Sequence, residues 1–112
     1  MNARSETMLW IAQRASAGVL ALCVTVHLVT LTYAIRGGLS AMEILARTKG
    51  SIGWLAFYTL FVIAVTVHVP IGLRSAFGEW LGWRGRLRDT VLAAFALALG
   101  VLGMRAVLGV FL

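Results

Sequence analysis

Charge is scarce in this sequence, and acidic charge is the scarcest. Only 12% of the 112 residues are charged, with four Asp or Glu against ten Lys or Arg, while 61% are hydrophobic. A soluble domain of this size cannot bury so many apolar side chains, because a small domain has a large surface relative to its volume. The composition therefore excludes an ordinary soluble fold and favours lipid as the solvent.

Cysteine and the usual catalytic groups are also nearly absent. The single cysteine, Cys23, has no partner for an intrachain disulfide, and we expect it to be a small core residue. The sequence offers no carboxylate pair, no nucleophile beside a base and no phosphate-binding loop. We therefore expect the chain to be non-catalytic when alone.

Three long stretches carry almost no charge. Residues 15–35 and 52–73 contain no charged residue, and residues 91–112 contain only Arg105. A helix rises about 1.5 Å per residue, so each stretch covers roughly 32 Å, enough for a hydrocarbon core of about 30 Å. Peptide groups in lipid must bond internally, so each stretch should be helical. The sequence predicts an all-α integral membrane bundle of three transmembrane helices, spanning about residues 14–35, 53–77 and 90–111 of a single anchor domain, residues 1–112.

The remaining segments are short. Residues 1–13 are expected to form a polar arm, residues 41–47 one or two helical turns, and residues 78–88 a basic loop. Pro70 should bend the second span near its end. Small residues of the third span are typical of close helix packing, namely Ala96, Gly100 and Gly103.

The basic residues predict the orientation. Six of them lie on the side of the N-terminus and the second connection, and three lie in the first connection, Arg36, Arg47 and Lys49. The positive-inside rule therefore predicts a cytoplasmic N-terminus. We expect the membrane to be the inner (cytoplasmic) membrane. Because these residues sit at the ends of spans and do not alternate with aromatics along one face, we expect no binding to nucleic acid.

Two histidines lie inside spans, where an unpaired imidazole is costly. At helical spacing His68 shares a face with Phe61, Ala64 and Gly72. Small and aromatic neighbours suit axial ligation of haem iron, and Arg74 near the membrane surface suits a haem propionate. The alternatives are a histidine bonded to a carbonyl or hydroxyl of a neighbouring helix, and a glycine that permits close packing.

His27 lies on a face of the first span that also carries small or polar side chains, namely Ser16, Cys23 and Thr30. It is expected either to ligate haem or to form a hydrogen bond across the bundle. Counted from the arginines near the cytoplasmic ends, His27 lies roughly 20 Å deep and His68 roughly 9 Å deep. Ligands of one iron must share a level, so the two histidines should serve separate irons. Each site then needs a partner subunit or a second copy of the chain.

Arg14 stands at the mouth of the first span, beside Gln13 and Ser16. It is either an ordinary anchor at the membrane surface or a functional residue. As a functional residue it would polarise a quinone carbonyl, with Ser16 donating a second hydrogen bond.

Two motifs resemble those of a known family. Residues 13–19, QRASAGV, resemble the His-Arg-x-Ser/Thr-Gly signature of the cytochrome b membrane-anchor subunits of succinate dehydrogenase and fumarate reductase (complex II), and residues 67–75, VHVPIGLRS, resemble their His-x-x-x-Gly-Ile-Arg-His signature. The length and the three-span plan also match. The chain departs from the pattern at Gln13 and Ser75, which replace histidines, and at Trp10, where relatives carry a quinone-contacting serine.

The resemblance implies a function for each of these residues. His68 would be the axial ligand of haem b, and Arg14 would lie at the quinone pocket near the iron–sulfur subunit, with a haem propionate as a second candidate contact. His27 is similar to the distal ligand of the diheme members, which implies one or two haems b shared with a partner anchor. The chain would anchor the flavoprotein and iron–sulfur subunits and carry electrons between succinate and quinone, in either direction.

Two other readings stay open from the sequence. The chain could be a b-type cytochrome subunit of another membrane oxidoreductase, of the hydrogenase or formate dehydrogenase type. It could also be a haem-free helical assembly protein.

Overall fold

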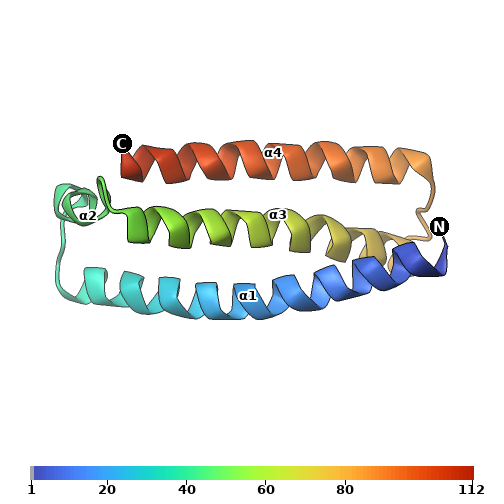
Figure 1. Cartoon of the computed structure of the whole chain (residues 1–112), viewed down its shortest axis with the longest axis horizontal. Helices are drawn as coiled ribbons and strands as arrows, with labels where there is room; N and C mark the ends of the chain where they lie inside the picture. Colours follow the sequence, from blue (N-terminus) through green and yellow to red (C-terminus); the bar gives the residue numbers. More distant parts are fainter. Residues whose placement is uncertain (1) are drawn as a thin grey trace.

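The computed structural model describes residues 2–112 as four helices and their connections (Figure 1). Three helices are long and apolar enough to cross a membrane, and one short helix joins the first two: α1 (Ala3–Arg36), α2 (Ala41–Thr48), α3 (Ile52–Trp80) and α4 (Arg86–Phe111). No strand occurs in residues 2–112. The prediction of an all-α protein with three transmembrane helices is confirmed.

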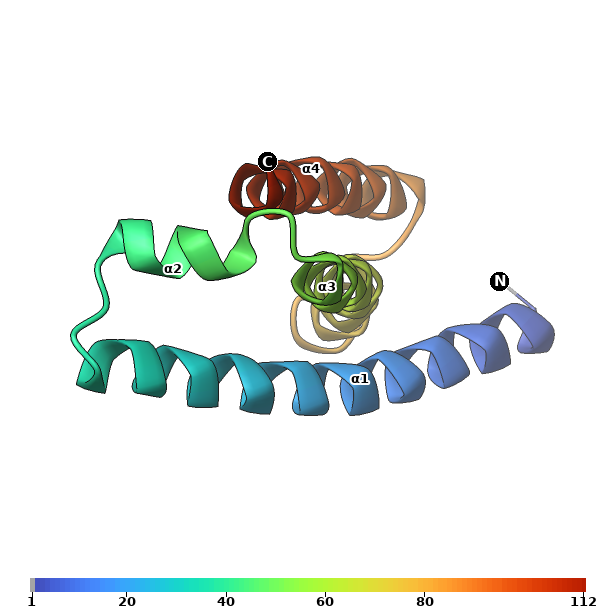
Figure 2. The ribbon, with the colours of Figure 1, turned by 60° about the vertical axis from the view of Figure 1, so that its left-hand side comes forward.

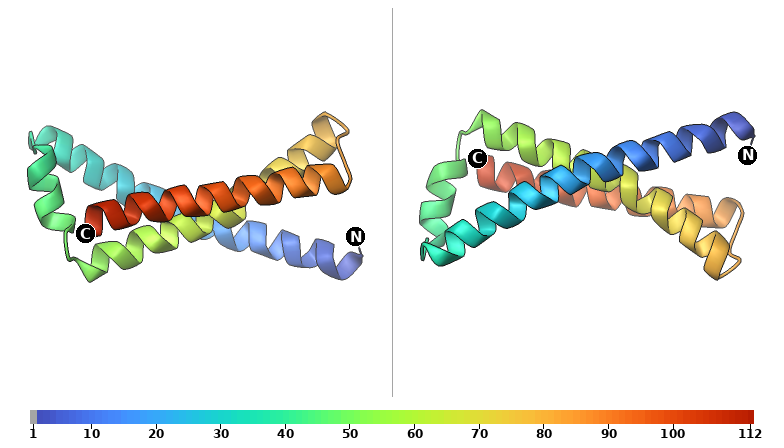
Figure 3. Two further views of the ribbon diagram at one scale, coloured as in Figure 1. Left: turned by 90° about the horizontal axis from the view of Figure 1, so that it is seen from above. Right: turned by 90° about the horizontal axis from the view of Figure 1, so that it is seen from below.

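The central helix of the arrangement is α3. Figure 2 shows α3 almost end-on, with α4 on one side and α1 on the other, and α3 packs against both. In Figure 3, α1 crosses α3 obliquely, and the N-terminus lies at the same end as the connection between α3 and α4. Large apolar side chains such as Leu22 and Leu97 remain exposed on the outer helices. These outer faces are suited to lipid or to neighbouring subunits.

The face of α1 toward α3 consists, apart from Leu20, of small and polar residues. They recur at alternating spacings of three and four, which keeps them on one face: Gln13, Ser16, Leu20, Cys23, His27, Thr30 and Ala34. Ser16 and Cys23 are buried, and Cys23, a free thiol, is only 1% exposed. The expectation that Cys23 is a small core residue is confirmed.

Glycines allow α4 to approach α3 closely. A Cβ atom on Gly103 would lie 2.7 Å from Cγ1 of Val62, and one on Gly100 would lie 3.7 Å from Cγ2 of Thr66. The first distance is shorter than van der Waals contact, so a larger residue at position 103 would require the Val62 side chain or one of the helices to move. The predicted packing role of these glycines is confirmed.

The predicted turns between the first two spans are confirmed as α2, which begins with a capping box. The Ser40 hydroxyl accepts a hydrogen bond from the Glu43 N–H at 3.2 Å, and the Glu43 carboxylate accepts one from the Ser40 N–H at 3.4 Å. Beyond α2, the Gly50 N–H donates to the Phe111 carbonyl at 2.9 Å. This bond ties the connection to the end of α4.

Two segment predictions were wrong. Residues 3–13 are not a polar arm but the start of α1, because Asn2 caps the helix by accepting a hydrogen bond from the Ser5 N–H at 2.9 Å. The predicted loop at 78–88 is shorter, since α3 continues to Trp80 and α4 begins at Arg86. The chain turns within residues 81–85, where Gly82 and Gly85 adopt positive φ angles of 65° and 111°. Helix α3 runs through Pro70 without interruption.

Replacing Gly103 with alanine should loosen the contact between α3 and α4. The new methyl group would collide with Val62, and such overpacking costs about 1–3 kcal/mol. We expect a lower midpoint of thermal unfolding in detergent, measured by circular dichroism. Gly109→Ala is the matched control, because a Cβ atom there meets nothing within 4 Å. Equal stability of the two variants would contradict the proposed contact.

Candidate functional site

His68 lies on the face of α3 that packs against α1, and it is half-buried. Its Nδ1 atom is 3.3 Å from the hydroxyl oxygen of Ser16, which is 7% exposed. The Ser16 hydroxyl donates to the Gln13 carbonyl at 3.1 Å. A serine hydroxyl has a single proton, so while that proton is donated to the Gln13 carbonyl, the oxygen can only accept from the Nδ1–H of His68. This tautomer leaves the lone pair of Nε2 free to bind a metal.

His27 faces α3 from the other side of the same interface. Its Nδ1 atom is 3.1 Å from the hydroxyl of Tyr58, and its ring meets the rings of Tyr58 and Phe61 edge-on at 5.7 Å. Trp54 and Phe57 extend this group, which we call the aromatic cluster, Trp54, Phe57, Tyr58 and Phe61. A phenol both donates and accepts, so this contact is compatible with either tautomer of His27.

The two histidines lie at different levels of the membrane. His68 lies beside Ser16 of α1, so Ser16 marks the level of His68 along that helix. His27 belongs to α1 itself and lies 27 − 16 = 11 residues further along it. Eleven residues of helix correspond to roughly 16 Å, more than the roughly 10 Å expected from the sequence. Within one chain, the two imidazoles therefore do not face a common iron.

An apolar groove of about 560 Å³ borders His27. All four helices contribute to its walls, which include Ile44, Phe61, Gly103 and Val107. This volume lies within the range of about 300–1,000 Å³ that is usual for cofactor and ligand sites. The groove thus combines an apolar surface with one imidazole at its edge.

These residues fit a haem better than a metal ion held by the protein alone. No group of three or more His, Cys, Asp or Glu side chains converges on one point within residues 2–112. A haem needs only axial ligands from the protein, because the porphyrin supplies the other donors. The Nε2 atom of His68 could serve as such a ligand, and a hydrogen-bonded Nδ1 is the arrangement common among metal-bound histidines.

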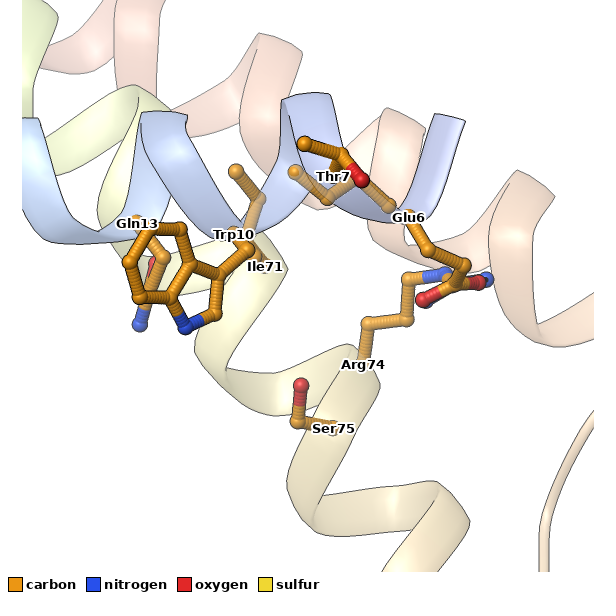
Figure 4. A pocket seen from close by; sticks show the side chains of 8 residues that line it. Glu6, Thr7, Trp10, Gln13, Ile71, Arg74 and Ser75 are labelled. Carbon is orange, nitrogen blue, oxygen red and sulfur yellow. Dashed lines mark ion pairs between the residues drawn. The ribbon is translucent and has the colours of Figure 1, made fainter. Parts of the chain in front are cut away.

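A second pocket, of about 450 Å³, lies between the first turns of α1 and the last turns of α3 (Figure 4). The Trp10 ring forms one wall, and Gln13, Ile71 and Ser75 contribute to the lining. Within residues 2–112 the buried Oε1 atom of Gln13 has no hydrogen-bond partner. A flat ligand with hydrogen-bonding oxygens would suit an aromatic wall flanked by an amide and a hydroxyl.

Arg74 joins three helices at this end of the molecule. Its guanidinium lies 3.5 Å from Glu6 of α1 and 3.7 Å from Asp89 of α4, and Arg74 itself belongs to α3. Both carboxylates are about half exposed, so each ion pair contributes little stability by itself. The contact of Arg74 with a haem propionate stays a prediction.

Arg14 and Ser16 do not line a common pocket. Ser16 is buried against His68, whereas Arg14 is exposed and lies 5.1 Å from the centre of the Trp10 ring. Two residues along a helix are about 200° apart around its axis, which explains the separation. Their joint role at quinone stays a prediction that this geometry does not favour.

Gly72 of α3 lies against the Gln13 side chain of α1. A Cβ atom on Gly72 would be 3.3 Å from the Nε2 atom of Gln13.

Sequence reasoning missed the pocket residues Trp10, Gln13 and Ser75 as a group. Gln13 and Ser75 each stand where the two motifs of the resembled family carry a histidine, and Trp10 stands where that family carries a serine. These three departures from the family motifs were the signal in the sequence that could have identified the pocket. They occur together in space, which the motifs taken separately do not indicate.

Comparison with known proteins identifies one family. The family model described as succinate dehydrogenase/fumarate reductase transmembrane subunit matches residues 1–108. No curated protein and no solved structure matches the chain.

Replacing Tyr58 with phenylalanine should destabilise the protein. The change removes the one hydroxyl that the described residues place within hydrogen-bond distance of the His27 ring and leaves the imidazole unpaired in an apolar site, at a cost of about 1–3 kcal/mol. Thermal unfolding in detergent measures the loss. Tyr33→Phe, at an exposed position of α1, is the control and should change little. A Tyr58→Phe protein as stable as the control would show that the hydroxyl is not needed.

Proposed function

The chain belongs to the family of succinate dehydrogenase/fumarate reductase transmembrane subunits, and on this premise we propose that it binds haem b through His68 and helps to carry electrons between the iron–sulfur subunit and quinone. The observation that supports this most is the hydrogen bond between Nδ1 of His68 and Ser16. It leaves Nε2 available to iron at membrane depth. Haem b, when bound, supplies a one-electron carrier.

A second haem b at His27 is part of the proposal. The apolar groove beside this histidine and the aromatic cluster that contacts its ring offer the surface that a porphyrin needs. The separation of roughly 16 Å along α1 means that each histidine would serve its own iron. Each iron would take its opposite ligand from a second anchor subunit or a second copy of this chain.

The pocket at Trp10 is the proposed site for the quinone headgroup. Its indole wall suits a flat ring, and the Gln13 amide and Ser75 hydroxyl suit the quinone oxygens. It lies at the N-terminal end, near the basic residues that the positive-inside rule assigns to the cytoplasm. This proposal replaces the pairing of Arg14 with Ser16 by residues that border one cavity.

The family also suggests the partners. A transmembrane subunit of this enzyme accompanies flavoprotein and iron–sulfur subunits, and we propose that they dock at the cytoplasmic, N-terminal end in the inner membrane. The chain would itself break no bond of succinate. The family match favours this reading over a cytochrome subunit of a hydrogenase or formate dehydrogenase and over a haem-free assembly protein.

Substitution of either histidine should remove one haem from the purified complex. We expect two haems per complex in the parent, and one in both His68→Ala and His27→Ala, because each variant deletes an axial ligand. Pyridine haemochrome assays against flavin content provide the measurement. Thr25→Ala, an exposed position whose hydroxyl bonds only within α1 in the structure, is the control. Full haem content in His68→Ala would refute the cytochrome assignment, and full content in His27→Ala would leave that histidine structural.

Quinone reduction should depend on the pocket at Trp10. Removing the Gln13 amide by Gln13→Leu deletes a hydrogen-bonding group worth about 1 kcal/mol or more, so the KM for quinone should rise about fivefold or more. Succinate oxidation with an artificial acceptor that accepts electrons from the soluble subunits should be unchanged. Trp80→Ala, at a highly exposed position outside the pocket, is the control for the membrane subunit. An unchanged KM in Gln13→Leu would place the quinone elsewhere.

A further inference from the structure

We propose that Ser16 is a positioning residue for the haem ligand: its buried hydroxyl holds His68 in the tautomer whose Nε2 binds iron and tunes the reduction potential of that iron. This inference rests on the proposed function, in which His68 binds haem b. It assigns to Ser16 a role different from quinone binding.

Only one placement of the hydroxyl proton makes both contacts of Ser16 hydrogen bonds. The Gln13 carbonyl accepts the hydroxyl proton of Ser16 at 3.1 Å, so the Ser16 oxygen is left to accept the Nδ1–H of His68 at 3.3 Å. If the hydroxyl proton were directed at Nδ1 instead, the remaining ring proton would sit on Nε2 and block ligation. The contact with the Gln13 carbonyl therefore favours the tautomer of His68 in which Nε2 is available.

Burial makes this hydroxyl difficult to replace. Ser16 is 7% exposed and packed between α1 and α3, where water has little access. Without the hydroxyl, the Nδ1–H would have no partner on the α1 side that the structure shows. The ring would then lose both its fixed tautomer and part of its orientation.

The same bond should affect the electronic properties of the ligand. An imidazole that donates its second N–H is a more basic ligand, and a more basic ligand favours the oxidised iron. Loss of the bond should therefore raise the midpoint potential of the haem. Loss of such an outer contact typically costs about 10–100-fold in affinity for the bound metal centre.

The test compares two variants of equal shape, Ser16→Thr and Ser16→Val. Both add bulk to the interface, but only threonine retains a hydroxyl, so overpacking affects both alike and the hydroxyl alone distinguishes them. In the purified complex, a redox titration followed at the reduced α-band gives the midpoint potential. Transfer of haem to excess apomyoglobin gives the rate of haem loss.

We expect Ser16→Val to have a higher midpoint potential than Ser16→Thr and to lose haem about 10–100-fold faster. Equal potentials and equal rates of loss in the two variants would overturn the role of Ser16. The variant His68→Ala distinguishes failure of the proposed function from failure of the inference about Ser16. If His68→Ala keeps its full haem, the proposed function fails; if it loses haem while the Ser16 variants agree, only the inference about Ser16 fails.

Discussion

The pairing of two imidazoles with hydroxyl groups across the α1–α3 interface is the constraint on which the rest depends. Lipid offers no hydrogen bonds, so a histidine inside a span needs a partner on the facing helix. Two such pairs occur, His68 with Ser16 and His27 with Tyr58. Because α1 and α3 run antiparallel, the residue numbers of facing residues should have a nearly constant sum. The two pairs give sums of 84 and 85. Two polar contacts separated by roughly 16 Å therefore fix how α1 lies along α3.

The opposite face of α3 is held in a different way. The contacts with α4 depend on glycines, which have no side chain. Val62 packs against Gly103, and Thr66 packs against Gly100. Dispersion between close-packed helices stabilises such an interface, but it provides no group for ligand chemistry. The functional candidates accordingly lie on the α1 side of α3 and at its two ends. The outer helices present mostly apolar surface to lipid or to other subunits.

The sequence was informative where one helix alone determines the outcome. Hydropathy predicted the three spans, spacing predicted the face of small and polar side chains around His27, and the glycines predicted the contact with α4. It failed where an end is set by a local cap, since Asn2 starts α1 about eleven residues earlier than the charge pattern suggested. It also failed to pair Ser16 with His68, because that contact depends on the rotation of two helices relative to each other, which periodicity within one helix does not contain.

Under the proposed function, one copy of this chain would supply only one axial ligand to each haem. One ring nitrogen of His68 is used within the chain, so only Nε2 remains for iron. A second axial ligand must approach from the opposite side of the porphyrin at the same level, and His27 lies roughly 16 Å away along α1. Its own contact with Tyr58 ties it to that other level. Under the proposed function, an iron bound at His68 would therefore take its opposite ligand from another chain, which would couple haem binding to assembly of the membrane subunits.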